Sequence, residues 1–497
     1  MATPHDENNG TVSISRVVCV HPKIEQPHRV LSLSNLDRQC PRLMQLVFFY
    51  NNLMKNDLSL NSVFNSLKIG LEETLIMWYP GAGRLMMMNP NNNNNNNNNQ
   101  SDGKLNLWCN NEGAILVEAE TKARISQLGD LSQYNEFFEN LVYKPDFDPN
   151  FSNMPLIVAQ VTKFGCGGYS IGIGTSHSLF DGPATYDFLY AWASNSEIMK
   201  GISAKPLELP KPVHERGILL SSGNNKQQLS KGSLNLPSSS NFYAHDEHNQ
   251  PIRAMAVQHL YQLIMQATAA ATLVHSRSEP SENNYQEKWV LKTYHLSAAM
   301  IDNLKRKYLS SIKTGSLPFS TFEVLTAHLW KARIKALRLS KEKVVCLQFA
   351  VDTRNKMVPP LPKGFSGNAY LLASLMMSVS QLLDHSSHEF IIEKIREAKN
   401  AVNHSYVKSY IDALELGSNN SLPPLKELTL VSDWTRMPFH NIEFFHGRKA
   451  AYASPLATPV PQVAYFMQSP FDVGGVDLRI GFQDGITLSA FTQCFLI

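Results

Sequence analysis

The sequence offers no pattern for disulfides or for a metal site. Its six cysteines are scattered over 497 residues, with no CxxC pair and no dense cluster. Such spacing gives no sign of a disulfide framework or of a zinc site. His385 and His388 could suggest a metal pair, but no third ligand follows at a useful spacing, and we expect both side chains to be solvated. We therefore expect a protein of a reducing compartment that uses no metal and no bound cofactor.

Long apolar runs and a large excess of one charge are also missing. The longest mildly apolar stretch, 260–274, is interrupted by Gln262 and Gln266, so it predicts a helix rather than a membrane span. The first ten residues are polar and lack a signal-peptide pattern. The formal net charge is only +3, without a Lys/Arg block, which argues against nucleic acid as the main partner. These features favour a monomeric cytoplasmic protein, and peripheral association with the endoplasmic reticulum stays open.

Nucleotide-binding fingerprints are absent as well, since the sequence has no GxGxxG or P-loop motif. The letters Gly-x-Ser-x-Gly occur at 168–172, but Ser170 then lies inside the strand expected at 169–176 and not on the strand-to-helix turn that a nucleophile elbow requires. Ser176 and Ser178 flank His177, but neighbours on a strand point to opposite faces, so neither is a natural nucleophile for that histidine. A serine-hydrolase interpretation is therefore excluded.

What is present is the composition of a well-buried α/β protein of two domains. Hydrophobic residues make up 43% of the chain and charged residues 18%. The composition shifts to proline, serine, asparagine and lysine around 205–250, so we expect an N-terminal domain at 1–204, a flexible linker at 205–253 and a C-terminal domain at 254–497. An asparagine tract at 91–99 interrupts a predicted hairpin, and we expect the tract to be a disordered insertion.

Periodicity predicts the individual elements. Helical spacing is found at 58–78, 255–275, 318–330 and 390–414. Strands are expected at 105–108, 114–119, 155–162, 169–176, 289–296, 344–351, 428–431, 463–467 and 476–482. Residues 486–492 also alternate like a strand. Cys494 stands four residues from the end, as in a prenylation pattern, but no basic segment precedes it and we do not expect lipidation.

The most informative stretch is 168–182. From Tyr169 to Ser176 larger side chains alternate with glycine and serine, which predicts a buried strand with something packed very close to its glycine-serine face. His177 follows where this strand ends, and Asp181 precedes a glycine and a proline that suit the start of a helix. A side chain at such a junction can be rigidly held and still face a cleft.

The pair His177 and Asp181 allows two interpretations. Sixteen histidines predict roughly 0.8 such pairs at this spacing by chance, and the sequence contains one, so the spacing alone is weak evidence. A neutral imidazole can accept a proton from a hydroxyl and contribute about 10²–10⁴-fold to a rate. The alternative is a core histidine bonded to a carbonyl, with Asp181 starting the helix. The residues by themselves leave both open.

Several further motifs, taken in order, resemble the plant BAHD acyl-CoA-dependent acyltransferases along nearly the whole chain. They lie at 31–37, 79–85, 177–182, 319–332, 360–368 and 433–439. The runs 166–182 and 423–441 resemble the brassinosteroid-related acyltransferases within that family. Together, these motifs are far more specific than any one of them.

The resemblance implies a fold and a mechanism. The fold would be α/β, with two chloramphenicol-acetyltransferase-like domains of mixed sheet plus helices and a channel between them. Acyl-CoA would be the co-substrate, and His177 would be the general base that takes the proton of the acceptor hydroxyl. Asp181 would hold the loop of His177, and we expect it to pair with Arg354.

The second motif of the family, Asp-Phe-Gly-Trp-Gly, is altered here. Its place is taken by Glu443-Phe444-Phe445-His446-Gly447, so that Phe444 and Gly447 are kept and Glu443 replaces aspartate. In the family this segment shapes the CoA side, and we therefore expect the change to affect CoA binding or the order of the loop.

For function, the resemblance implies acyl transfer to a hydroxyl of a small, largely apolar acceptor. A brassinosteroid or its precursor is the acceptor we expect, and its conjugation would lower the level of active hormone. Two alternatives remain: a non-catalytic family member that modulates lipid-elongating enzymes, or an enzyme that acylates a phenolic or amine acceptor.

Overall fold

The computed structural model describes residues 11–39, 43–51, 58–87, 105–146, 148, 151–196, 211–220, 290–309, 319–416, 427–445, 447–456 and 463–496. The chain divides into two compact units. Unit 1 consists of Met1–Gly217, Pro362–Asn368 and Met437–Ala457, and unit 2 of Ile218–Leu361, Ala369–Arg436 and Thr458–Ile497. The expected helix at 255–275 and the asparagine tract lie outside the described residues.

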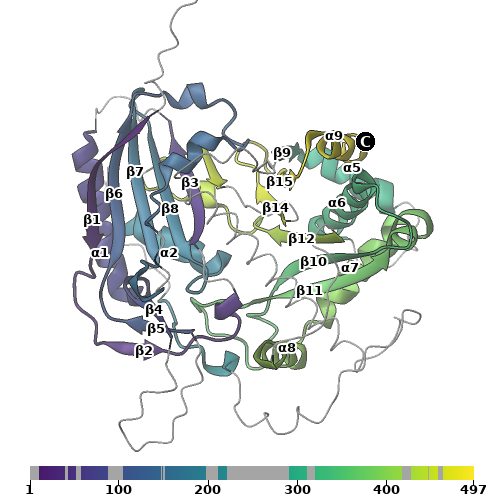
Figure 1. Cartoon of the computed structure of the whole chain (residues 1–497), viewed down its shortest axis with the longest axis horizontal. Coiled ribbons are helices and arrows are strands. Elements are labelled where there is room, and N and C mark those ends of the chain that lie inside the picture. Colours follow the sequence, from purple (N-terminus) through teal and green to yellow (C-terminus); the bar gives the residue numbers. More distant parts are fainter. Residues whose placement is uncertain are drawn as a thin grey trace, which may run out of the picture. The chain divides into compact units, whose positions relative to one another are not determined.

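Unit 1 is built on a six-stranded mixed sheet in the order β1-β6-β7-β8-β3-β13, whose main strands lie side by side in Figure 1. Its strands are β1 (Val12–Val20), β3 (Leu43–Tyr50), β6 (Ala114–Thr121), β7 (Ile157–Phe164), β8 (Tyr169–Ser176) and β13 (Tyr452–Pro455). A second sheet contains β2 (Arg29–Leu31), β4 (Arg84–Met87) and β5 (Leu105–Cys109). Since β4 pairs antiparallel with β5, the hairpin expected on either side of the asparagine tract is confirmed.

Two helices of unit 1 pack together beside this sheet: α1 (Leu60–Met77) and α2 (Gly182–Asn195). The indole Nε1 of Trp192 in α2 donates a hydrogen bond to the carbonyl of Leu67 in α1, at 2.9 Å. Helix α1 starts at the cap Ser59 and ends before the turn 79–82, where proline and glycine follow. The predicted helix at 58–78 is therefore confirmed.

Unit 2 holds the other six-stranded sheet, in the order β11-β10-β12-β14-β15-β9. Its strands are β9 (Val290–Leu296), β10 (Val344–Asp352), β11 (Tyr370–Ser378), β12 (Leu428–Asp433), β14 (Val463–Gln468) and β15 (Val476–Phe482). The sequence predicted all of them except β11, which follows directly after the motif at 360–368. Both units thus combine a mixed sheet with helices, which confirms the predicted α/β class.

The helices of unit 2 centre on α6 (Thr321–Leu337), which packs against α5 (Ala298–Leu309), α7 (His388–Ala401) and α9 (Gly485–Phe495). Ser320 and Glu323 form a reciprocal capping box at the start of α6. None of the helices in the described ranges combines the length and the apolar character that crossing a bilayer requires.

The single long helix expected at 390–414 is wrong. The chain forms α7 and then α8 (His404–Leu416), because Val402 is extended and ends the first helix. The side chain of Asn403 then accepts a hydrogen bond from the backbone N–H of Tyr406, at 2.9 Å, and starts the second. The two amphipathic runs are separated by a new cap that the apolar pattern alone did not reveal.

The strand expected at 486–492 is also wrong, since these residues belong to α9. Asp484 caps this helix through the backbone N–H of Thr487, at 2.6 Å. Phe491 and Phe495, four residues apart, are both buried and contact the ring of Tyr294 in β9. Burial of these two phenylalanines favours a helix over a strand here, and the alternation at 486–492 was a chance pattern.

The predicted domain limits at 204, 253 and 254 stay predictions, because most of 197–289 lies outside the described residues. The unit limits add a feature that a single linker does not anticipate: segments 362–368 and 437–457 of the second half belong to unit 1. Residues 211–217 of the expected linker belong there too, and Val213 forms a parallel bridge with Phe365. These segments bring side chains from distant parts of the sequence to the end of β8.

Candidate functional site

Strand β8 carries His177 to its position. It pairs with β7 on one side and β3 on the other, and all eight of its residues are buried. A Cβ on Gly172 would lie 1.9 Å from the carbonyl oxygen of Leu141, so the predicted close approach to the glycine-serine face is confirmed. Directly after the strand, the backbone N–H of Leu179 bonds to the carbonyl of Ser176, which turns the chain. His177 is thus held at the end of a rigid central strand.

Asp181 is the N-cap of α2. Its Oδ1 accepts a hydrogen bond from the backbone N–H of Ala184, at 3.1 Å, and its side chain is buried. Pro183 stands in the first turn of the helix, as predicted. This arrangement fixes the loop that joins His177 to α2. The pairing of Asp181 with Arg354 stays a prediction, since the two belong to different units; within unit 2, Arg354 lies 3.4 Å from the carboxylate of Asp352.

Asn368 determines which nitrogen of His177 carries the proton. Its Nδ2 donates to Oδ1 of Asp37, at 3.0 Å, and to the carbonyl oxygen of His177, at 2.7 Å. With both amide hydrogens directed to oxygens, its Oδ1 is left as the acceptor that faces Nδ1 of His177, at 3.0 Å. Nδ1 must therefore be the donor, and Nε2 carries the lone pair. A histidine in this tautomer can act as a base through Nε2.

Burial lowers the pKa of His177 below its ordinary value. Hydrogen bonds to its own backbone and to Asn368, together with the charges of Asp181 and Asp37, act in the opposite direction but do not outweigh burial. The imidazole is consequently neutral at neutral pH. Once it has accepted a proton, the two carboxylates and the amide oxygen of Asn368 stabilise the cation.

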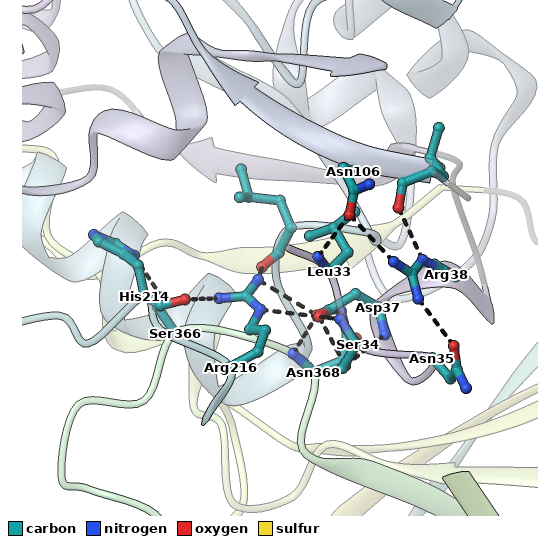
Figure 2. Close-up of polar contacts among 12 residues, drawn as sticks. Leu33, Ser34, Asn35, Asp37, Arg38, Asn106, His214, Arg216, Ser366 and Asn368 are labelled. Atoms are coloured by element: carbon teal, nitrogen blue, oxygen red, sulfur yellow. Dashed lines mark hydrogen bonds and ion pairs between the residues drawn. The ribbon is translucent and has the colours of Figure 1, made fainter. Parts of the chain in front are cut away.

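The carboxylate of Asp37 lies at the centre of this hydrogen-bond network (Figure 2). It belongs to the short helix η1 (Asp37–Gln39) and is completely buried. Next to it, Arg38 holds the loop in place by bonding to the carbonyl of Leu105 and to the side chain of Asn106, both in β5. Residues from the N-terminal loop and from 362–368 thereby meet at His177.

The altered second motif forms a defined turn in unit 1. Oε2 of Glu443 accepts a hydrogen bond from the backbone N–H of Gly447, at 3.0 Å, and Gly447 has a positive φ of 70° that glycine tolerates best. Phe444 is fully buried between the rings of Phe48 and Trp192, with centroids at 6.0 and 5.0 Å. Phe444 and Gly447 thus have structural reasons to be kept, and Glu443 bonds across the turn. His446 lies outside the described residues, and an effect on CoA binding stays a prediction.

The remaining histidine pair does not form a site. His385 is exposed, but His388 is half-buried and stacks on Tyr308 with ring centroids 4.2 Å apart, so the expectation that both are solvated is wrong for His388. Burial lowers the pKa of His388 to about 4. Across the described ranges of the chain, no three histidine, cysteine, aspartate or glutamate side chains gather as a metal would require.

Comparison with known proteins settles the family. The sequence model of the Transferase family matches residues 11–495, nearly the whole chain. The chain is also 46% identical to Brassinosteroid-related acyltransferase 1 of Arabidopsis thaliana, over 98% of both proteins. The chain belongs to the BAHD acyltransferase family. It is therefore an acyl-CoA-dependent acyltransferase, which confirms the prediction of an enzyme.

More distant BAHD relatives and solved structures agree. The chain is 28% identical to Fatty alcohol:caffeoyl-CoA acyltransferase of Arabidopsis thaliana, over 93% of both proteins. The structure of vinorine synthase superposes with a TM-score of 0.63 at 19% identity, covering 97% of this chain and 96% of that one. The TRI101 structure with coenzyme A and T-2 gives 0.60 at 14% identity, covering 94% and 97%. These two structures confirm the predicted chloramphenicol-acetyltransferase-like BAHD fold.

Sequence reasoning identified His177 and Asp181 but assigned no role to three neighbours. Asp37 and Asn368 stand inside motifs that supported the family resemblance, so a signal was present but no chemistry was attached to it. Arg216 falls in the expected flexible linker and had no signal at all, although its side chain is almost completely buried against Asp37.

Proposed function

We propose that this BAHD enzyme transfers the acyl group of an acyl-CoA to a hydroxyl of a small apolar acceptor, with His177 as the general base. The observation that carries the proposal is the hydrogen-bond environment of His177. Its Nδ1 donates to Asn368, 3.0 Å away, so Nε2 is the basic nitrogen. Asp181 and Asn368 are positioning residues in this scheme.

The reaction balances without a covalent enzyme intermediate. Nε2 of His177 takes the proton of the acceptor hydroxyl as its oxygen attacks the thioester carbonyl. The tetrahedral intermediate then collapses, the carbon–sulfur bond breaks, and the imidazolium returns the proton to the CoA thiolate. Holding both substrates in one site supplies up to about 7–11 kcal/mol of the barrier reduction in favourable cases.

The acceptor we propose is a brassinosteroid or its precursor, which would lose hormone activity on acylation. Support comes from the 46% identity to a relative whose name is brassinosteroid-related. Two further relatives, named for a fatty alcohol and for omega-hydroxypalmitate, also take their names from apolar hydroxylated compounds. A phenolic or amine acceptor has weaker support, from relatives at 26–28% identity such as Rosmarinate synthase and Anthranilate N-benzoyltransferase protein 1.

The test is an acceptor screen with the purified full chain and radiolabelled acyl-CoAs of different chain length. We expect label to appear in an ester of a hydroxylated steroid. Replacing His177 by alanine removes the base and should lower turnover by about 10²–10⁴-fold. The matched control is His385→Ala, which removes an exposed histidine outside the site. Unchanged turnover in His177→Ala would refute the mechanism, and label found in an amide or a phenolic ester would refute the acceptor.

A further inference from the structure

The strongest unassigned feature is the buried ion pair between Asp37 and Arg216. Nε of Arg216 lies 2.9 Å from Oδ2 of Asp37, and the two side chains are 1% and 0% exposed. A buried ion pair adds little net stability compared with apolar residues of similar size. Stability alone therefore does not explain why this pair is present. Arg216 lies in the segment expected to be a linker, 39 residues after His177 in the sequence.

The carboxylate of Asp37 also accepts hydrogen bonds from Ser34 and Asn368. The backbone N–H and the hydroxyl of Ser34 both donate to Oδ2, at 2.8 Å. The backbone N–H and Nδ2 of Asn368 both donate to Oδ1, at 3.0 Å. Although burial acts to raise the pKa of Asp37, the charge of Arg216 and these hydrogen bonds outweigh it and hold that pKa below its usual value. Asp37 is thus a permanently ionised acceptor placed against Asn368.

We infer that Arg216 and Asp37 are positioning residues that fix the tautomer of His177 through Asn368. The inference rests on the proposed function of His177. An ionised Asp37 accepts only, so it holds the NH₂ group of Asn368 on its own side and turns the amide oxygen towards Nδ1. The opposite amide orientation would place that oxygen against a carboxylate and against the carbonyl of His177, which is unfavourable at both points.

Two details show that the guanidinium is held in one orientation. Its NH1 donates to the carbonyl of His214, at 2.6 Å, and a Cβ on Gly367 would lie only 2.7 Å from its Cζ. Gly367 directly precedes Asn368, so only glycine lets the guanidinium reach Asp37 beside that backbone. His214 is itself anchored: its ring nitrogens lie 2.7 Å from the carbonyl of Met77 and 2.7 Å from the hydroxyl of Ser366. Figure 2 shows how Arg216 and Asn368 converge on Asp37 from different segments.

The experiment reads the tautomer directly. The full chain is labelled with ¹⁵N-histidine, the ring signals of His177 are assigned by their loss in His177→Gln, and kcat and KM are measured on the same samples. The key variant is the double substitution Asp37→Asn with Arg216→Met, which removes both charges together and leaves no lone buried charge to prevent folding. Arg216→Lys keeps the charge without the planar fork.

We expect the wild-type His177 to carry its proton on Nδ1, and the double variant to show a mixture of tautomers. Its kcat should fall about tenfold to hundredfold, a fraction of what the base contributes, with KM changed much less. The kcat and the tautomer ratio of Arg216→Lys should lie between those of the wild type and those of the double variant. The matched control is Arg84→Met, since Arg84 is also a buried arginine of unit 1 but pairs with Glu112.

Retention of the Nδ1–H tautomer and of kcat in a folded double variant would overturn the inference. An equal fall of kcat in Arg84→Met would also overturn it, because the effect would then be general destabilisation. The proposed function fails separately, through unchanged turnover in His177→Ala, and the tautomer measurement does not depend on that result.

Discussion

Replacing Asn368 by leucine tests the local geometry most directly, because the two side chains have similar size. The change removes the acceptor at Nδ1 of His177 and the donor that bonds both Asp37 and the carbonyl of His177. Asp37 keeps its contacts with Ser34, Arg216 and the backbone N–H of residue 368. The carboxylate therefore stays paired, and the protein should still fold.

The size of both effects follows from these contacts. Losing one hydrogen bond to a charged group and two to neutral groups should destabilise the fold by about 2.5–6 kcal/mol. The ring of His177 then loses its fixed tautomer, and we expect kcat/KM to fall about 10²-fold, or about 2.7 kcal/mol of transition-state stabilisation. His177→Ala sets the lower limit of the rate in the same assay.

The assay combines urea unfolding with kcat/KM for the best acceptor of the screen. Gln160→Met is the matched control, because Gln160 is a buried amide whose Nε2 also donates two hydrogen bonds, to Asn140 and Thr162, at 2.9 and 3.0 Å. It should lose stability and keep its kcat/KM. If Asn368→Leu folds and keeps the wild-type kcat/KM, the orientation of His177 does not depend on Asn368, and the reasoning is refuted.

Three further predictions concern the same region. Burial lowers the pKa of His177, and the base works in its neutral form. The loss of kcat/KM on acidification, measured over a pH series, should therefore be centred below pH 6.5. A loss centred above that value would contradict the lowered pKa. Asp181→Ala should lower the free energy of unfolding by about 1–2 kcal/mol, because α2 loses its cap. Asp181→Asn can still cap the helix and should lower it less. Equal losses, measured from urea midpoints, would refute the capping role. Gly172→Ala should destabilise the fold by about 1–3 kcal/mol, since its Cβ would meet the carbonyl of Leu141, whereas Gly485→Ala, with nothing within 4 Å, should not; equal unfolding midpoints for the two variants would show that β8 yields to the added methyl group.

The sequence alone determined much of the architecture and the central residue. Local patterns found β8, the start of α6 and the hairpin around the asparagine tract, because alternation, capping residues and turn residues act over a few positions. The junction of a buried strand, His177 and the capping Asp181 is equally local. The ordered motifs then indicated the family, and the family predicted the fold.

Only the tertiary structure decided what surrounds His177. Arg216 and Asn368 follow Asp37 by 179 and 331 positions in the chain. The three residues meet because their segments all pack into unit 1. Their hydrogen bonds set the tautomer of His177, and no spacing rule can predict a network made of contacts so distant in sequence. For the same reason Arg216 looked like part of a polar linker, and the strand pattern of α9 hid the burial of Phe491 and Phe495. Local chemistry determined the helices and strands, and long-range packing determined which nitrogen of His177 carries the proton.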